Sequence, residues 1–306
     1  AAPPGSPHGE RAMAAAGEDP GLEWKKGFLH SSKSRRAAPR PRATSATETE
    51  FERLCRGGDQ MGLQSFLEQR PGYDVNRELS ADVQQGWTAL FCVAHYGHAD
   101  LVADLVEAGG NCAREDDDGW TPLFVAAFNG HEAVVEALLD ASEHDVNRGD
   151  RLGRTALHVA VEEGQTRAVQ VLLRAGSNAN QADQDGMTPM HVAARAGHAN
   201  VIEQLITSLA DVAGVDRWGR TALHLAAEEG HADAIRALAR GGARTNAQEE
   251  MGYTPLHTAA ANGKLEAITA LLESGANPAA TTTTGDTPLS VASADAVREV
   301  LRKALG

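Results

Sequence analysis

The sequence predicts an all-α repeat solenoid, and two regular features of the chain carry this prediction. Glycine recurs at intervals of 33 residues, with one interval of 34, at Gly86, Gly119, Gly153, Gly186, Gly219, Gly252 and Gly285. A threonine follows each of these glycines two residues later. Because a fixed period of this length is typical of stacked structural units, we expect each unit to contact only its neighbours in one elongated domain.

The first 45 residues lack this period and are rich in Ala, Pro, Ser and Gly, so we expect a disordered tail. The stretch from Lys25 to Arg42 contains seven basic residues and no acidic one. Its interpretation stays open between a solvated linker, a nuclear-import or organelle-targeting signal, and an internal ligand for the chain's own repeats. Met13 is a candidate native start, and residues 1–12 carry no functional prediction.

Residues 46–82 keep the layout of a repeat in degenerate form, and we predict an N-terminal capping unit there. Apolar residues lie at helical spacing on either side of a Gly-Gly break, namely Phe51, Leu54 and Cys55, then Leu63, Phe66 and Leu67. A cap is expected because the end of an uncapped solenoid would expose its core.

Residues 83–284 are predicted to form six full repeats, and the fourth copy shows how each is built. The turn Asp183 to Gly186 predicts a β-hairpin finger, because glycine tolerates the positive φ of such a turn. Thr188 is the expected N-cap of a short inner helix, which Gly197 ends. The apolar face of an outer helix follows at Val201, Ile202, Leu205 and Ile206, with equivalents at Val134, Val135, Leu138 and Leu139.

Two exit loops depart from the pattern. One extra residue lies between Ala141 and Asp150, and Ser208-Leu209 stands where other copies place glycine after the outer helix. Because a non-glycine residue in the left-handed region costs about 1 kcal/mol or more, we expect both loops to be reshaped or loose. Residues 285–306 form a truncated last copy, which predicts a C-terminal cap.

The tetrapeptides at the repeated threonines resemble the Thr-Pro-Leu-His signature of the ankyrin repeat. Examples are Thr155-Ala-Leu-His158, Thr188-Pro-Met-His191 and Thr254-Pro-Leu-His257. The resemblance extends from about residue 83 to the C-terminus and implies an ankyrin-repeat array of helix-turn-helix units with β-hairpin fingers. It also implies a structural role for two sets of histidines: His158, His191, His224 and His257, and His98, His131, His198 and His231.

The sequence offers no catalytic, metal-binding or cofactor-binding motif. Asp116 to Gly119 hints at a calcium loop, but Val125 occupies the place of the bidentate glutamate. Successive histidines of one set lie one repeat apart, roughly 10 Å, which is too far to share a metal bound at about 2 Å. The three cysteines share no zinc-site spacing, so we expect reduced thiols in an intracellular protein, cytoplasmic or nuclear. We therefore predict no enzyme activity and no cofactor.

Ankyrin-type proteins bind macromolecules through finger tips and the exposed side of inner helices, and this resemblance directs attention to six aromatic residues. Trp87, Trp120, Trp218 and Tyr253 adjoin finger glycines, and Tyr96 and Phe128 end inner helices. We expect them to lie outside the core as binding residues, with an N-terminal anchor of Trp87, Tyr96, Trp120 and Phe128. The alternative is that they pack finger against finger. Charged residues complete the candidate surface: Asp117, Asp118, Arg154, Glu162, Glu163 and Arg220.

The formal charge of −14 argues against a general nucleic-acid or anionic-membrane binder. We expect a monomer, without membrane insertion, that binds a protein or peptide partner of basic or mixed charge. The predicted function is a non-catalytic adaptor or scaffold. The alternatives are a regulatory inhibitor that masks a basic motif on its partner and the regulatory part of a larger enzyme.

Asn147 is a candidate site of modification. Leu139 followed by Asp145-Val146-Asn147 resembles the leucine-anchored Asp-Val-Asn segment that asparagine hydroxylases modify in ankyrin loops. Asn180 and Asn246 occupy the equivalent position without an aspartate two residues earlier. The alternative is a plain loop asparagine.

Overall fold

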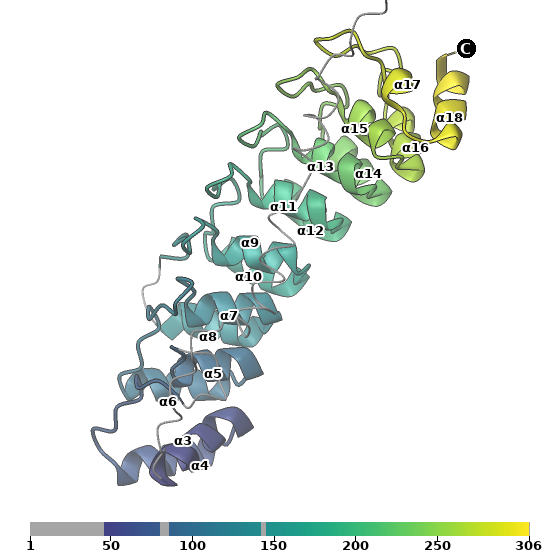
Figure 1. The fold of residues 1–306 in the computed structure, drawn as a ribbon. Helices are drawn as coiled ribbons and strands as arrows, with labels where there is room; N and C mark the ends of the chain where they lie inside the picture. Colours follow the sequence, from purple (N-terminus) through teal and green to yellow (C-terminus); the bar gives the residue numbers. More distant parts are fainter. Residues whose placement is uncertain (1–45, 80–85, 142–144, 306) are drawn as a thin grey trace, which may run out of the picture. The chain divides into compact units, whose positions relative to one another are not determined.

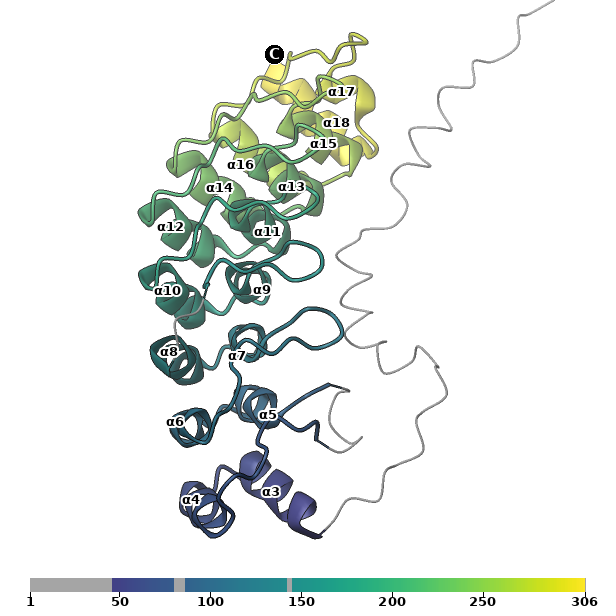
Figure 2. The ribbon, with the colours of Figure 1, turned by 90° about the vertical axis from the view of Figure 1, so that its left-hand side faces the viewer.

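The computed structural model describes residues 46–79, 86–141 and 145–305, which form one row of stacked helix pairs (Figure 1). The inner helices are α3 (Ala46–Gly57), α5 (Ala89–Tyr96), α7 (Pro122–Asn129), α9 (Ala156–Glu162), α11 (Pro189–Ala196), α13 (Ala222–Glu229), α15 (Pro255–Ala261) and α17 (Pro288–Val291). The outer helices are α4 (Gln60–Gln69), α6 (Asp100–Glu107), α8 (Glu132–Ala141), α10 (Thr166–Arg174), α12 (Ala199–Thr207), α14 (Ala232–Arg240), α16 (Leu265–Glu273) and α18 (Asp295–Leu305). Figure 2 shows the two columns of helices, with finger loops extending from the inner column. The predicted repeat solenoid is confirmed.

The fingers are tight hairpin turns with little strand pairing. Within the described ranges, β pairing is limited to an isolated bridge between Val215 and Thr221. The fourth finger is closed by the Asp183 N–H, which donates to the Met187 carbonyl over 3.0 Å, and Gly186 has the predicted positive φ of 78°. Neighbouring fingers also bond to each other, since the Gln184 N–H donates to the Leu152 carbonyl over 3.0 Å. The fingers therefore form a connected edge of the array.

From α5 onward the inner helices begin at the repeated threonines, as predicted, and in four copies the signature histidine completes the cap. The backbone N–H of Thr155 donates to Nδ1 of His158 over 3.1 Å. Nε2 of the same ring donates to the Met187 carbonyl in the next finger over 3.1 Å. Because Nδ1 accepts, the ring is the neutral tautomer with its proton on Nε2. The histidine thus joins the start of one helix to the following repeat, as the family resemblance implied.

The second set of histidines bonds each repeat to the one before it. Nε2 of His131 donates to the His95 carbonyl over 2.9 Å. Its ring lies against Gly97, where a Cβ would stand only 2.8 Å from Nδ1 of His131. Gly97 also has a φ of 85°, so glycine serves both the turn that ends α5 and the close approach of the next repeat.

The core is a continuous strip formed by the outer helices against the inner ones. Val134, Val135 and Leu138 of α8 are fully buried, as are their equivalents Ile202 and Leu205 of α12. Each such side chain contributes roughly 1.5–3 kcal/mol on burial. The fourth residue of the predicted stripe is only half-buried, at Leu139 and Ile206. The apolar face is therefore narrower than the sequence suggested.

The prediction that the Ser208-Leu209 exit loop is reshaped or loose is wrong. The Ser208-Leu209 loop keeps the shape of the glycine loops, because the Ala210 N–H donates to the Leu205 carbonyl as Ser177 does to Leu172, both over 3.0 Å. Leu209 is instead forced to a φ of 61°. The loop is strained and neither reshaped nor loose.

The exit loops are joined by an asparagine ladder that the sequence did not reveal. Oδ1 of Asn180 accepts the Asp211 N–H of the next loop over 2.7 Å, and Asn76 and Asn246 make the same bond to Asn111 and Asn277.

At the ends of the row, α3 and α4 stand where we predicted the N-terminal cap, and α17 and α18 where we predicted the C-terminal one. The division into caps and full repeats stays a prediction, and every prediction for the tail lies outside the described residues.

Candidate partner-binding surface

The tryptophans of the first two fingers are buried, which corrects our expectation that they lie outside the core. Trp87 and Trp120 each retain only 4% of their exposure. Trp87 stacks on Phe91, with ring centroids 5.7 Å apart, and Trp120 packs against Phe124 at 5.9 Å. Phe91 and Phe124 occupy the position of the signature histidine. An apolar ring therefore replaces the imidazole that caps the inner helix in other repeats, and the indole packs over this ring. Most of this packing is onto the inner helix of the same repeat, which differs from the finger-against-finger packing of our alternative; the Trp120 indole N–H does reach the next finger, at Asp150.

Arg154 is held by an internal ion pair. The Asp150 carboxylate accepts hydrogen bonds from Nε and Nη2 of Arg154, at 2.9 and 2.7 Å, and from the Trp120 indole N–H at 3.2 Å. The fifth finger repeats this arrangement, because Asp216 binds Nε of Arg220 over 2.9 Å. The side chains of Arg154 and Arg220, which we predicted to contact a partner, are therefore engaged in ion pairs that stabilise their own fingers.

Tyr96 and Phe128 remain accessible at the ends of the neighbouring helices α5 and α7. Tyr96 is 47% exposed and Phe128 is half-buried. The Tyr96 ring lies 4.9 Å from that of His95, and Phe128 rests on Trp120 at 5.6 Å. Burial, and secondarily His131, lowers the pKa of His95, which keeps this ring neutral. We call His95, Tyr96, Phe128 and Asn129 the aromatic patch.

The predicted acidic residues divide into exposed and buried ones. Asp117 and Asp118 are exposed at the tip of the second finger, and within the described part of the chain their carboxylates form no ion pair. Glu163 is half-buried, whereas Glu162 is buried and pairs with Arg195 at 3.5 Å. Glu162 is thus part of the scaffold, and Asp117 and Asp118 are the acids available to a partner.

Trp218 and Tyr253 form a second, separate aromatic region on the fifth and sixth fingers. Two guanidinium groups lie against the Trp218 ring, with Cζ of Arg217 at 4.1 Å and of Arg220 at 4.6 Å from its centroid. Tyr253 is half-buried against His257, and burial raises the pKa of its hydroxyl, with Asp286 and Glu249 adding to the effect. This region adjoins α13 and α15, so the predicted residues form two surfaces and not one.

Asn147, the candidate site of modification, takes part in the asparagine ladder of the exit loops. Its Oδ1 accepts the Asn178 N–H over 2.6 Å, and its own N–H donates to Oδ1 of Asp145 over 3.0 Å. Hydroxylation at this residue stays a prediction.

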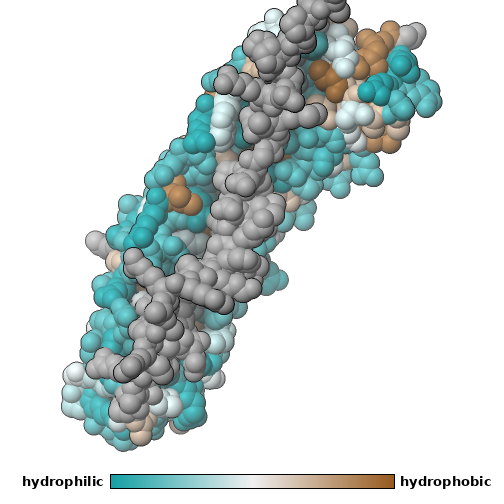
Figure 3. Space-filling model, viewed as in Figure 1, coloured by the Kyte–Doolittle hydropathy of each residue, from teal (hydrophilic) through white to brown (hydrophobic). Residues whose placement is uncertain are grey.

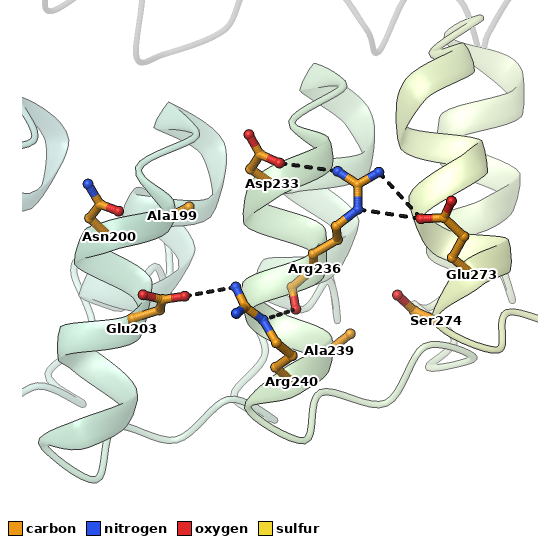
Figure 4. Close-up of a pocket in the computed structure, with 9 residues that line it drawn as sticks. All are labelled: Ala199, Asn200, Glu203, Asp233, Arg236, Ala239, Arg240, Glu273 and Ser274. Atoms are coloured by element: carbon orange, nitrogen blue, oxygen red, sulfur yellow. Dashed lines mark hydrogen bonds and ion pairs between the residues drawn. The ribbon is translucent and has the colours of Figure 1, made fainter.

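An open groove of about 810 Å³ crosses the outer helices α12, α14 and α16, away from the predicted surface (Figure 4). Ion pairs cross it: Glu203 to Arg240 at 2.8 Å, and Arg236 to both Asp233 at 3.1 Å and Glu273 at 3.4 Å. Both inter-helix pairs join residues 37 positions apart, one repeat plus one helical turn, a signal that sequence reasoning missed. Because its charges are exposed and paired with one another, each pair contributes little to stability and the groove offers no chemistry.

No metal-binding cluster of His, Cys, Asp or Glu occurs in the part of the chain that the structure describes. None of the described helices combines the length and the apolar composition that crossing a bilayer requires.

Comparison with known proteins identifies what this arrangement is similar to. A family described as "Ankyrin repeats (3 copies)" matches residues 54–150, 141–216, 157–248, 201–282 and 241–304. Among solved structures, the chain is similar to the ankyrin repeat domain of Bcl-3, described as a unique member of the IkappaB protein family. That match has 29% sequence identity and a TM-score of 0.61, and it covers 72% of this chain and 100% of the Bcl-3 chain. The search of curated proteins found no match.

Proposed function

The chain belongs to the ankyrin-repeat family, and from this premise we propose that it is a non-catalytic adaptor that holds a protein partner on its finger and inner-helix face. Ankyrin repeats generally mediate protein–protein interaction. The observation that carries the proposal is the aromatic patch, where Tyr96 is 47% exposed on an otherwise tightly bonded scaffold. We infer that this patch is the anchor of the interface.

The patch has the physical properties of a binding hot spot. Tyr96 and Phe128 lie on neighbouring helices and are supported from below by His95 and by the buried Trp120. Aromatic side chains that are already held in place bury a large area at a small cost in conformational entropy. The tryptophans thus support the patch without touching the partner.

The charge of the array favours a basic or mixed-charge partner. Because the first 44 residues carry eight basic and four acidic side chains, the formal charge of −14 for the whole chain corresponds to −18 for residues 45–306. Asp117 and Asp118, exposed on the second finger, place part of this charge beside the N-terminal repeats. Such a field steers a basic partner toward this end and repels nucleic acid.

A second candidate is a regulatory inhibitor that masks a basic motif on its partner in the cytoplasm or nucleus. The exposed Asp117 and Asp118 favour it, as does the similarity to a member of the IkappaB family. An adaptor would leave its partner's other contacts available, whereas an inhibitor would occlude them. Action as the regulatory part of a larger enzyme would require a catalytic domain in a longer chain.

The test is affinity capture with the full chain as bait, compared with Tyr96→Ala/Phe128→Ala. We expect the double variant to lose a specific partner, with a drop in affinity of about tenfold or more. Leu152→Ala is the matched control, because it removes an exposed apolar side chain from a finger tip elsewhere. A partner retained equally by both variants would refute the aromatic patch as the anchor.

A further inference from the structure

The loop that joins α12 to the fifth finger exposes two large apolar residues. Leu209 is 87% exposed and Val215 is 56% exposed. The face drawn in Figure 3 is mostly hydrophilic, with few hydrophobic residues standing out on it. Other repeats carry small or polar residues at these positions: Gly109, Gly176, Gly242 and Gly275 for Leu209, and Glu115, Gly149, Ala182, Gln248 and Thr281 for Val215. The shared fold therefore does not require either side chain.

Leu209 also carries a backbone strain. Its φ of 61° is the one positive value for a residue other than glycine in the described ranges. The loop holds this conformation firmly, because the Ala210 N–H bonds to Leu205 and the Asp211 N–H bonds to Oδ1 of Asn180 over 2.7 Å. Strain that persists in a well-ordered segment is characteristic of positions kept for function. Exposure and strain are independent costs, and both fall on one residue.

The surroundings of the loop are basic, in contrast with the array as a whole. Its neighbours are the ends of α10 and α14, which pack on either side of α12. Arg174 ends α10 and Arg244 follows α14, and both are exposed without an ion pair in the described structure. Arg240, nearby on α14, already pairs with Glu203. The single acid of the loop, Asp211, accepts the Ala213 N–H with its carboxylate.

We propose that residues 208–215 form a docking surface for an acidic amphipathic segment of a protein partner. Apolar side chains of the segment cover Leu209 and Val215, and its carboxylates meet Arg174 and Arg244. This partner has the opposite charge to the one expected at the aromatic patch, so the array can bridge two different ligands. The surface does not depend on the proposed function of the aromatic patch.

The test uses a phage-displayed library of random peptides of about 16 residues, which span about 24 Å as a helix. The library is first depleted on the full chain carrying Leu209→Gly and Val215→Ser, and then selected on the unchanged full chain. Surviving peptides are measured against the unchanged chain, the depleting variant, Arg174→Glu/Arg244→Glu, and the control Leu152→Ala. Leu209→Gly removes the strain, so this variant should unfold at no lower a temperature than the unchanged chain. Lost binding then cannot be attributed to misfolding.

We expect surviving peptides rich in acidic and large apolar residues. Each should lose about tenfold or more in affinity with the loop variant and with the arginine variant, and should bind more weakly as salt rises. Leu152→Ala should leave their affinity within about twofold, because that leucine lies on a distant finger tip. The proposal is overturned if no loop-dependent peptide survives, if survivors are basic, or if their affinity does not fall with Arg174→Glu/Arg244→Glu.

Discussion

Leu209 occupies a conformation that glycine occupies in the equivalent loops, where Gly176 and Gly242 have φ values of 89° and 90°. Replacing it with glycine should relieve about 1–2 kcal/mol of strain and return about 0.5–1 kcal/mol to the entropy of the unfolded chain. We predict that Leu209→Gly raises the free energy of unfolding by about 0.5–1 kcal/mol. Urea unfolding at neutral pH measures this change.

The control for this prediction is Leu209→Ala, which keeps a Cβ and therefore keeps the strain. If alanine and glycine change the stability equally, exposure of the leucine and not its backbone would be responsible. The sequence correctly predicted that the absence of glycine at Leu209 has an energetic cost. It wrongly predicted that the loop would be reshaped or loose, since the loop keeps its shape and the backbone of Leu209 is strained. The absence of glycine shows that the loop conformation costs free energy. Whether the loop changes conformation or keeps it under strain depends on the hydrogen bonds that hold it, which the sequence does not show.

Trp87 and Trp120 show why a position in a repeat does not by itself establish exposure. Their place beside the finger glycine is evident from the sequence, as are the phenylalanines that stand in place of the signature histidine. The wrong inference was that the indoles do not pack in the core of the array. When Phe91 replaces histidine, the polar link to the next finger is lost, and an apolar ring is left that a neighbouring tryptophan covers. The sequence contained both halves of this pair, but not their contact.

At the scale of elements, four histidines hold helix starts to the following fingers, and this makes the array sensitive to acid. Burial lowers the pKa of His158 to about 4, and burial also lowers the pKa of His191, His224 and His257. A lowered folded-state pKa means that stability is complete above the unfolded value of 6.5 and is lost as pH falls below it. For His158 the loss between pH 6.5 and pH 5 is about 2 kcal/mol.

The measurement is hydrogen exchange at pH 7 and pH 5, expressed as protection factors. We predict that protection falls in α9, α11, α13 and α15, which begin with the signature histidine. Helix α7 provides the internal control, because Phe124 fills the same slot and this helix contains no histidine. An equal loss of protection in all five helices would contradict a role for these histidines.

Element boundaries were the most predictable feature of this chain, for a local physical reason. Threonine before a helix and glycine after it act on the backbone within one turn, so Thr188 and Gly197 mark the ends of α11 without knowledge of the rest. Contacts between repeats were harder to predict. The Glu203–Arg240 pair and the Asn180 ladder depend on how far one repeat is rotated against the next, which no single repeat encodes.

At the scale of the whole array, charge is unevenly distributed. Exposed acids lie on the second finger at Asp117 and Asp118, and exposed arginines flank the loop around Leu209. The central fingers are nearly neutral, since Arg154 and Arg220 pair with Asp150 and Asp216. A long array of this kind can present surfaces of opposite charge to different ligands, because each repeat contacts only its neighbours.

The same nearest-neighbour construction predicts how the array fails when its end is removed. Helix α18 packs on α16 through Val297 and Leu301, both fully buried, while Glu299 and Lys303 face solvent as an ion pair. Deleting residues 285–306 removes these two contacts, at roughly 1.5–3 kcal/mol each, and uncovers the face of α16 around Leu271 and Leu272. We predict that hydrogen-exchange protection is lost first in α15 and α16, while α5 to α11 keep theirs.

Replacement of Lys303 by alanine is the control, because an exposed ion pair contributes little to stability and protection should not change. Uniform loss along the shortened row would mean that the repeats unfold as one unit, and uniform retention would mean that α17 and α18 do not act as a cap.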